Sequence, residues 1–469
     1  MAELLIDEPD AHVFWTAFDP LDLASESIDP LGFMAGYIAL ADRILPGFTT
    51  ITTVPRYASM LCYALQAGIN ASGGFNAEDP STRRKRIMER LKLLERAWAL
   101  ACGLAEGAGG LGDKATNGLR GVRAVRRFLR LHEGKEKISL SYDLLSNQIR
   151  YGGIGTYGTF LEMLHLADMA SLTLRPLGER LAQAFPAPDA YGLPTTFGDV
   201  RLPVEALVRW GIDAHVSTLT TDEARWLRDA LQGGEEAEFD DHARWVMLRV
   251  IRDCDPQLDM EESHLLSLCL SRLRRNSIPD VDPAGQGIQR LTTALRHIEP
   301  YERMYQGFAF LFDRIRAMAL DRGQASLASI AHEPAVESAA EAVRQAATDL
   351  LTKWGATGNA QMQLGPACAR LRELGIVELA RTLAGTSDAR AICQEVLRRH
   401  ARVQDGKFDG GLPKGPWIRF EVGSDDRVVL TQQRYGLEPG QARSSWTAMA
   451  RHPYRTEGAR RFIRLCRIS

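Results

Sequence analysis

Apolar residues recur at helical spacing along most of the chain, and this pattern predicts a mainly α, multi-helical fold. Residues 31–45 carry one apolar stripe with the period of a helix that buries one face. Pro46 ends this helix and Pro55 opens the next. The same pattern predicts a long helix near residues 81–105 and a basic amphipathic helix around residues 118–132.

The pattern changes after His400, where turn residues separate short runs of alternating apolar and polar positions. Two strands are expected, at Trp417–Val422 and Arg427–Gln432, with a hairpin turn at Gly423 between them. The tail closes with a short basic helix. We therefore expect a small β element near the C-terminus of a helical protein.

The 469 residues suggest about two to four domains. Shifts of composition favour three: an N-terminal helical domain at residues 1–190, an acidic helical middle domain at residues 191–334, and a C-terminal domain at residues 335–469. The last would hold the β hairpin and a basic tail.

Residues 140–185 show the order helix, glycine turn, helix, short strand and helix, which is typical of a winged-helix unit whose second helix reads a DNA groove. Two alternatives remain open. Gly153, Gly155 and Tyr157 lie in a glycine elbow that could turn backbone amides toward a phosphate, as in a helix-hairpin-helix clamp. The elbow could also be a structural turn that binds nothing.

Overall composition is that of a soluble globular protein, with 45% hydrophobic and 25% charged residues. The net charge of −2 conceals a strong segregation of charge. Residues 1–30 hold eight acidic and no basic side chains, residues 83–96 and 114–137 are strongly basic, and residues 222–262 hold thirteen acidic side chains and five arginines. The basic stretches could bind a polyanion, and the acidic middle could bind a protein partner.

Several classes of protein have no support. The N-terminal residues lack the early positive charge of a targeting signal, and no apolar run reaches the ~18 residues of a membrane span. Seven scattered cysteines read as reduced thiols, so we expect a cytoplasmic protein with no membrane contact. No metal-ligand spacing, Walker sequence or nucleophile elbow occurs, so no metal and no cofactor are predicted.

Cationic, hydroxyl and aromatic residues in turns are the candidates for nucleic-acid contact. Around the turn between the first two helices and at the glycine elbow they are Arg43, Thr52, Thr53, Arg56, Tyr57, Gly153, Gly155 and Tyr157. In the C-terminal loops they are Lys407, Lys414, Trp417, Arg451, His452, Tyr454 and Arg455. Each could instead be a helix cap or a core anchor.

Four segments together resemble poorly characterised bacterial proteins of anti-phage defence loci. They are PLGFMAGYIALADRILPGFTTITTVPRY, the YGGIGTYG elbow followed by LTLRPLGERLA, KGPW, and HPYRTEGARRFI. The likeness covers the first ~190 and the last ~70 residues. It implies an activity such as that of the phage-defence DNA glycosylases, which excise glucosylated hydroxymethylcytosine. No residue matches a glycosylase motif, so no catalytic residue is carried over.

The leading hypothesis is a DNA-binding defence protein that excises modified bases of foreign DNA, with phage DNA as the expected partner, and leaves abasic sites. Such an enzyme flips its target base and uses a carboxylate to orient water or support a cationic sugar. Asp42, beside Arg43 and the threonine-rich turn, is the first candidate, and Asp143 is the second. The alternative is a non-catalytic winged-helix DNA-recognition or regulatory subunit, and a third hypothesis is an RNA-binding effector.

Overall fold

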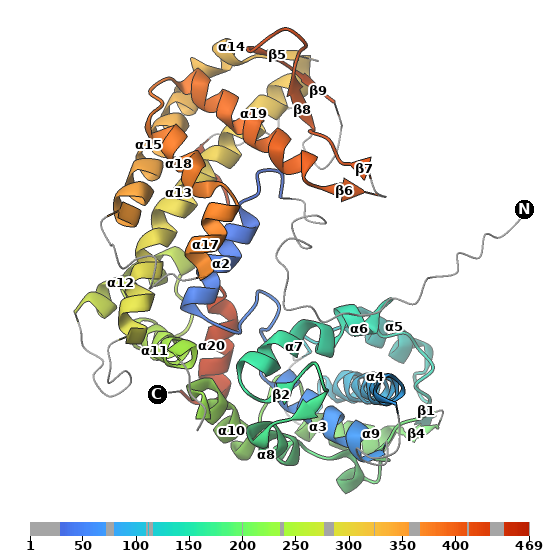
Figure 1. The fold of residues 1–469 in the computed structure, drawn as a ribbon. Coiled ribbons are helices and arrows are strands. Elements are labelled where there is room, and N and C mark those ends of the chain that lie inside the picture. The colour runs from blue at the N-terminus through green and yellow to red at the C-terminus, as the bar shows by residue number, and fades with distance from the viewer. Residues whose placement is uncertain are drawn as a thin grey trace, which may run out of the picture.

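The structure is a computed structural model that is mainly helical, as the apolar pattern predicts (Figure 1). It describes residues 29–71, 79–108, 111, 116–198, 200–234, 239–275, 286–322, 324–355, 366–409, 412–431 and 445–468. Figure 1 shows two helical bodies, which we call the lower and the upper body after their place in that view.

The lower body is built around the long helix α4 (Pro80–Ala105), which packs against α3 (Arg56–Ala71) and α9 (Val204–Asp213). Its remaining helices are α5 (Val122–Leu131), α6 (Gln148–Tyr151), α7 (Gly153–Met163), α8 (Pro176–Ala184), a short 3-10 helix (Pro188–Tyr191) and α10 (Thr221–Gln232). Two antiparallel strand pairs complete it: β1 (Lys137–Ile138) with β4 (Leu202–Pro203), and β2 (Ala167–Asp168) with β3 (Thr173–Leu174).

The upper body is built around α13 (Gln286–Arg322), which packs along α15 (Pro334–Gly355). Its other helices are α2 (Met34–Ile44), α11 (Phe239–Cys254), α12 (Glu262–Arg274), α14 (Leu327–Ala331), α17 (Pro366–Glu373), α18 (Ile376–Ala384) and α19 (Ala389–Asp405). Helix α2 lies here although it precedes the lower body in sequence, because it packs against α11, α13 and α17. A Cβ at Gly36 would lie 2.4 Å from the Tyr301 hydroxyl, so only glycine allows this close crossing.

The predicted C-terminal hairpin is present. Strand β8 (Ile418–Phe420) pairs antiparallel with β9 (Arg427–Leu430), and Gly423 in the turn has a left-handed φ of +80°. A third strand that the sequence pattern does not reveal, β5 (Gln324–Ser326), pairs with the other edge of β9. A separate pair, β6 (Phe408–Asp409) with β7 (Leu412–Pro413), precedes the hairpin.

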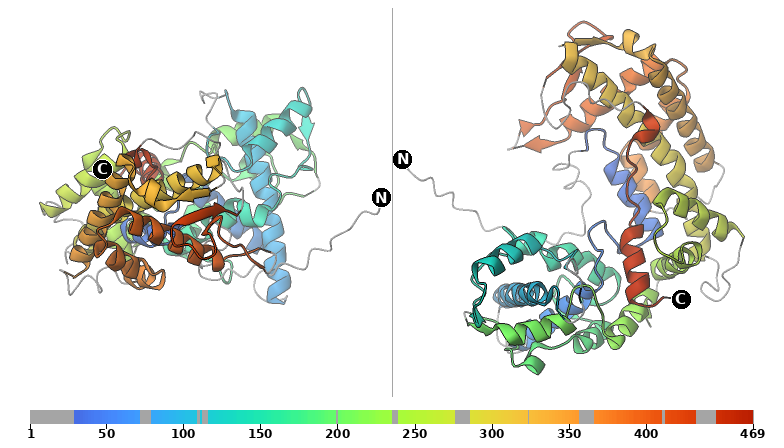
Figure 2. Two further views of the ribbon diagram at one scale, coloured as in Figure 1. Left: turned by 90° about the horizontal axis from the view of Figure 1, so that it is seen from above. Right: turned by 180° about the vertical axis from the view of Figure 1, so that it is seen from behind.

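The two bodies meet at the C-terminal helix α20 (Thr456–Leu465), which lies between α2 and the lower body in both Figures 1 and 2. The ring of Phe462 packs 5.0 Å from Phe48 and 5.1 Å from Phe160 of α7, measured between centroids. A short 3-10 helix, Trp446–Ala448, and an extended segment lead the chain into α20. Helix α20 thus joins α2, the first described helix, to the lower body.

The predicted helix boundaries agree with the structure to within a few residues. Asp79 caps α4 by accepting a hydrogen bond from the backbone amide of Thr82. The predicted domain boundaries near residues 190 and 334 each separate helices that pack on each other. Helix α9 packs on α4 across the first boundary, and α15 packs on α13 across the second.

Candidate functional site

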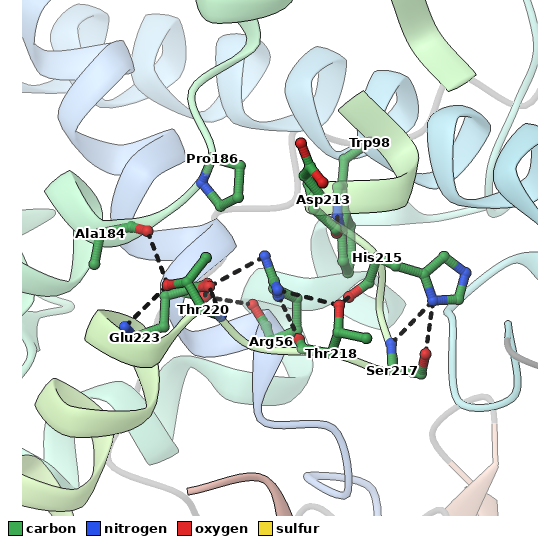
Figure 3. A network of polar contacts seen from close by, with 12 residues as sticks. Arg56, Trp98, Ala184, Pro186, Asp213, His215, Ser217, Thr218, Thr220 and Glu223 are labelled. Carbon is green, nitrogen blue, oxygen red and sulfur yellow. Dashed lines mark hydrogen bonds and ion pairs between the residues drawn. The ribbon is translucent and has the colours of Figure 1, made fainter. Parts of the chain in front are cut away.

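Arg56, a predicted phosphate contact, begins α3 inside the lower body (Figure 3). Its side chain is fully buried, with Nη1 3.2 Å from Oε2 of Glu223. Its Nε donates a 2.7 Å hydrogen bond to the backbone carbonyl of Thr218. Burial lowers the pKa of Arg56, and the Glu223 carboxylate opposes that shift. The Arg56 guanidinium therefore has no exposed surface with which to reach a phosphate.

Glu223 joins this arginine to the start of α10. Its backbone amide donates to the Thr220 hydroxyl at 3.1 Å, and its carboxylate accepts from the Thr220 amide at 2.8 Å, which forms a capping box. The Ser59 hydroxyl also donates to Glu223, at 2.5 Å. One carboxylate thus caps α10 and neutralises a buried cation of α3, so both helices depend on it.

Tyr57 and Tyr157, the predicted base-stacking rings, stack on each other in the same core, with centroids 4.9 Å apart. The Tyr57 hydroxyl accepts a 2.7 Å hydrogen bond from the amide of Arg120, and the Tyr157 hydroxyl accepts one of 2.9 Å from the amide of Val54. Burial raises the pKa of both phenols. Both rings are fully packed by protein, which leaves no face for a base.

The two threonines of the predicted phosphate turn differ in burial. Thr52 is buried, and its hydroxyl accepts a 2.6 Å hydrogen bond from the amide of Thr49 and lies 3.2 Å from the Thr49 carbonyl. Thr53 is half-buried. The Thr52 hydroxyl therefore closes the turn that carries the chain from α2 to α3.

The glycine elbow at the start of α7 contacts a carboxyl group of the protein itself, and burial raises the pKa of that group. The amide of Gly153 donates a 2.6 Å hydrogen bond to Oε1 of Glu95, a buried carboxylate of α4. The side-chain amide of Gln148 donates a 2.8 Å hydrogen bond to the other carboxyl oxygen of Glu95. A Cβ at Gly155 would lie 2.2 Å from the carbonyl oxygen of Arg150, so glycine here permits close packing of α7 on α6.

Asp42 and Arg43, adjacent on α2, enter different ion pairs. Asp42 pairs with Arg455, and its side chain is 48% exposed whereas that of Arg455 is buried. Arg43 is buried, with Nη1 3.9 Å from the Asp240 carboxylate, and burial lowers its pKa to about 10. Both residues therefore fix α2 against neighbouring segments of the chain.

The C-terminal residues His452 and Tyr454 share one buried carboxylate, that of Glu302 on α13. The Tyr454 hydroxyl donates to it at 2.6 Å, and the His452 Nδ1 lies 2.9 Å from it. The His452 ring stacks on Tyr37 of α2, with centroids 4.8 Å apart. This segment therefore fastens α2 to α13 rather than offering its rings to solvent.

Beside His452 lies an open recess between α12, α13 and the segment before α20, with a smaller part of about 60 Å³. Arg451 lines it and pairs with Glu299 at 3.0 Å. Glu261 and Glu262 line both parts, and burial raises the pKa of Glu262. Arg303 also lines the recess and lies 3.5 Å from Glu299. Carboxylates outnumber cations in this recess, which disfavours a phosphate backbone beside Arg451.

Lys407 and Trp417 lie against the first described residues of the chain. The Lys407 ammonium donates to the carbonyl of Asp29, and the Trp417 amide donates a 2.9 Å hydrogen bond to Nε2 of His400. Both side chains are buried, while Lys414 is half-buried. The Nδ1 of His400 lies 2.9 Å from the carbonyl of Pro30. Lys407 and His400 therefore hold the segment that leads into α2.

Asp143, the second carboxylate candidate, lies in the loop before α6. Its side chain is 88% exposed and lies 3.4 Å from Nη2 of Arg96. Asp42 lies on α2 of the upper body and Asp143 in the lower body, so the fold gives the two candidates separate surroundings.

One row of exposed cationic residues lies on α5. Arg123, Arg127 and Arg130 are exposed at helical spacing, and the opposite face of α5 buries Val125 and Phe128. A fourth arginine on the exposed side, Arg126, is held by Glu106 at 2.7 Å. These arginines belong to the second basic stretch of the sequence.

Tyr151 is an exposed aromatic residue of the neighbouring helix α6, and the sequence pattern did not single it out. It is 46% exposed at the end of α6, and the Arg150 guanidinium lies 5.6 Å from its ring centroid. Arg120, just before α5, donates two hydrogen bonds of 2.9 and 2.8 Å to the Tyr151 carbonyl and so ties α6 to α5. Figure 1 shows α5 and α6 side by side along one edge of the lower body. We call Arg123, Arg127, Arg130 and Tyr151 the α5 face.

Comparisons with family models, with curated proteins and with solved structures gave no match to this chain. Within the described residues, no group of three or more His, Cys, Asp or Glu side chains could hold a metal ion. Likewise, no helix in the described part of the chain is long and apolar enough to cross a membrane.

Proposed function

We propose that this protein binds DNA through the α5 face. The observation that carries the proposal is the exposed row formed by Arg123, Arg127 and Arg130. Arginine binds phosphate oxygens through paired donors, and an exposed aromatic ring beside it stacks on bases. The α5 face combines both groups on one edge of the lower body, which supports a sequence-independent grip on the DNA backbone.

The winged-helix interpretation of residues 140–185 places the reading helix at α7. In α7, which is described throughout, the exposed side chains are those of Thr159 and Glu162, and neither is a cation. Its amino end is occupied by Glu95. Our proposal therefore places the DNA contact on α5. The winged-helix-like unit at residues 140–185 stays a prediction.

Between the two hypothesised classes, the geometry favours the DNA-recognition subunit over the base-excising enzyme. Base excision requires a carboxylate that faces a pocket for a flipped base. The Asp42 carboxylate is engaged by Arg455, and Asp143 lies exposed beside Arg96. A role in defence against phage DNA rests on the resemblance of the four sequence segments.

The test incubates the purified protein with two phage DNAs, one with plain and one with glucosylated cytosines. Native gels then measure binding, and denaturing gels with and without alkali measure strand breaks. We expect both DNAs to be retarded without breaks. Alkali-dependent breaks in the modified DNA would make the protein a glycosylase instead, breaks without alkali would make it a nuclease, and failure to retard either DNA at low salt would refute the proposal.

A further inference from the structure

A pocket of about 360 Å³ opens in the lower body, between the start of α8 and the end of α10. Its volume is that of a small-molecule site. The polar side chains that line it are those of His165, Arg175, Arg180, Asp229 and Gln232. None of them belongs to the α5 face, and in Figure 1 α8 and α10 lie along the opposite edge of the lower body from α5.

The imidazole of His165 lines one wall of this pocket, and a carboxylate outside the pocket lining fixes its orientation. The Nε2 of His165 lies 3.1 Å from a carboxylate oxygen of Asp241, a buried residue of α11. Asp241 in turn pairs with Arg244, which is fully buried. Because Asp241 accepts a hydrogen bond from Nε2, the lone pair of the neutral ring is at Nδ1, on the side of Arg175.

Two guanidinium groups accompany this imidazole. Arg175 Nη1 lies 3.2 Å from His165 Nδ1, so its donors are held at the wall of the pocket. Arg180, one turn into α8, lies with its guanidinium carbon 4.9 Å from the ring centroid of Trp226. Two arginines that converge on one pocket match the geometry and charge of a phosphate group.

The α10 side of the pocket has a different chemistry. Asp229 and Gln232 present a carboxylate and an amide there. A carboxylate repels a phosphate but accepts hydrogen bonds from hydroxyl groups, and an amide can both donate and accept. The pocket is therefore cationic on the α8 side and suited to hydroxyls on the α10 side.

We propose that this pocket binds a phosphorylated sugar, with the phosphate on Arg175 and Arg180 and the sugar hydroxyls on Asp229 and Gln232. His165, positioned by Asp241, accepts a hydrogen bond from Arg175 through Nδ1 and so holds that guanidinium at the phosphate position. This site is independent of the proposed DNA contact on α5.

Isothermal titration at low salt with ribose 5-phosphate, inorganic phosphate and ribose tests the proposal. We expect ribose 5-phosphate to bind more tightly than inorganic phosphate and ribose to bind least. Arg175→Gln and Arg180→Gln should each weaken ribose 5-phosphate about tenfold or more, as the loss of a charged hydrogen bond predicts. Asp229→Asn should weaken ribose 5-phosphate and leave inorganic phosphate unchanged.

Arg225→Gln is the matched control, because Arg225 lies over the same Trp226 ring, at 4.2 Å, yet does not line the pocket. It should bind ribose 5-phosphate as the wild type does. Absence of binding by the wild type at millimolar concentration would overturn the proposal, as would equal losses in Arg180→Gln and Arg225→Gln. Displacement of ribose 5-phosphate by a duplex oligonucleotide, with an equal loss of DNA binding in Arg180→Gln, would assign the pocket to DNA instead.

Discussion

Two arginine-bearing regions of the lower body, the start of α3 and the outward side of α5, have opposite surroundings. Arg56 is fully buried and lies 3.2 Å from Glu223 of α10. Arg123, Arg127 and Arg130 are exposed on a helix that buries only its apolar side. Both regions were expected to attract phosphate on the strength of their charge. Only the second has surface with which to do so.

The difference shows that the role of a cationic residue in a turn, phosphate contact or buried ion pair, cannot be assigned until its counter-charge is located. Glu223 is remote in sequence from Arg56, and Glu95, which fills the glycine elbow, is remote from Gly153. A buried ion costs several kcal/mol unless a partner compensates for it. An exposed arginine needs no such partner, since water solvates it.

The largest expected effect comes from breaking the buried pair. Glu223→Gln leaves the Arg56 cation buried without its counter-charge and weakens the α10 capping box. We expect the free energy of unfolding to fall by about 3–5 kcal/mol, measured by urea denaturation. Asp222→Asn, at a neighbour whose side chain is 65% exposed, is the matched control and should change it by less than about 0.5 kcal/mol. Equal changes in the two variants would contradict a structural role for the Arg56 pair.

His400 extends the comparison to the upper body, because it is a potential cation that burial keeps neutral. Burial lowers its pKa from 6.5 to about 4, and its two ring nitrogens contact Pro30 and Trp417. A folded-state pKa below the unfolded value means that stability is present above pH 6.5 and is lost as the pH falls toward 4.

We therefore expect the wild type to lose up to about 3 kcal/mol more stability over that pH interval than His400→Gln does. Urea denaturation of both proteins at several pH values measures the difference. The quantity to compare is the slope of the free energy of unfolding against pH, because the substitution itself lowers stability at neutral pH. Parallel pH profiles would show that His400 does not titrate on unfolding.

The exposed region is tested by its salt dependence. The variant Arg123→Gln/Arg127→Gln/Arg130→Gln should weaken DNA binding about tenfold or more and should lower the slope of log affinity against log salt by about two to three. Fluorescence anisotropy with a duplex oligonucleotide measures both quantities. Arg381→Gln/Arg398→Gln/Arg402→Gln removes the same charge from exposed helix positions of the upper body and should leave the slope unchanged. An unchanged slope in the α5 variant would remove that face from the interface.

The smallest expected effect is that of Asp42→Asn, which tests whether Asp42 has a structural or a catalytic role. Asp42→Asn keeps the shape of the side chain but weakens the pair with Arg455, which retains the Leu45 carbonyl at 3.4 Å. We expect a loss of about 1 kcal/mol in the free energy of unfolding and no change in DNA affinity. Any alkali-revealed base excision that vanishes in this variant, with folding intact, would restore Asp42 as a catalytic candidate.

The sequence by itself determined that the chain is mainly helical, the approximate limits of several helices and the C-terminal hairpin, because these depend on local features. The apolar period, Pro46, the Asp79 cap and the Gly423 turn act over a few residues that stand together in the chain. The tertiary structure alone decided which polar residues face solvent. That choice is made by long-range partners, as Glu223 pairs with Arg56, Glu95 with Gly153 and Glu302 with His452. A charged group can be buried only where the fold brings such a partner next to it. The partner is remote in sequence, so the local sequence pattern does not predict it.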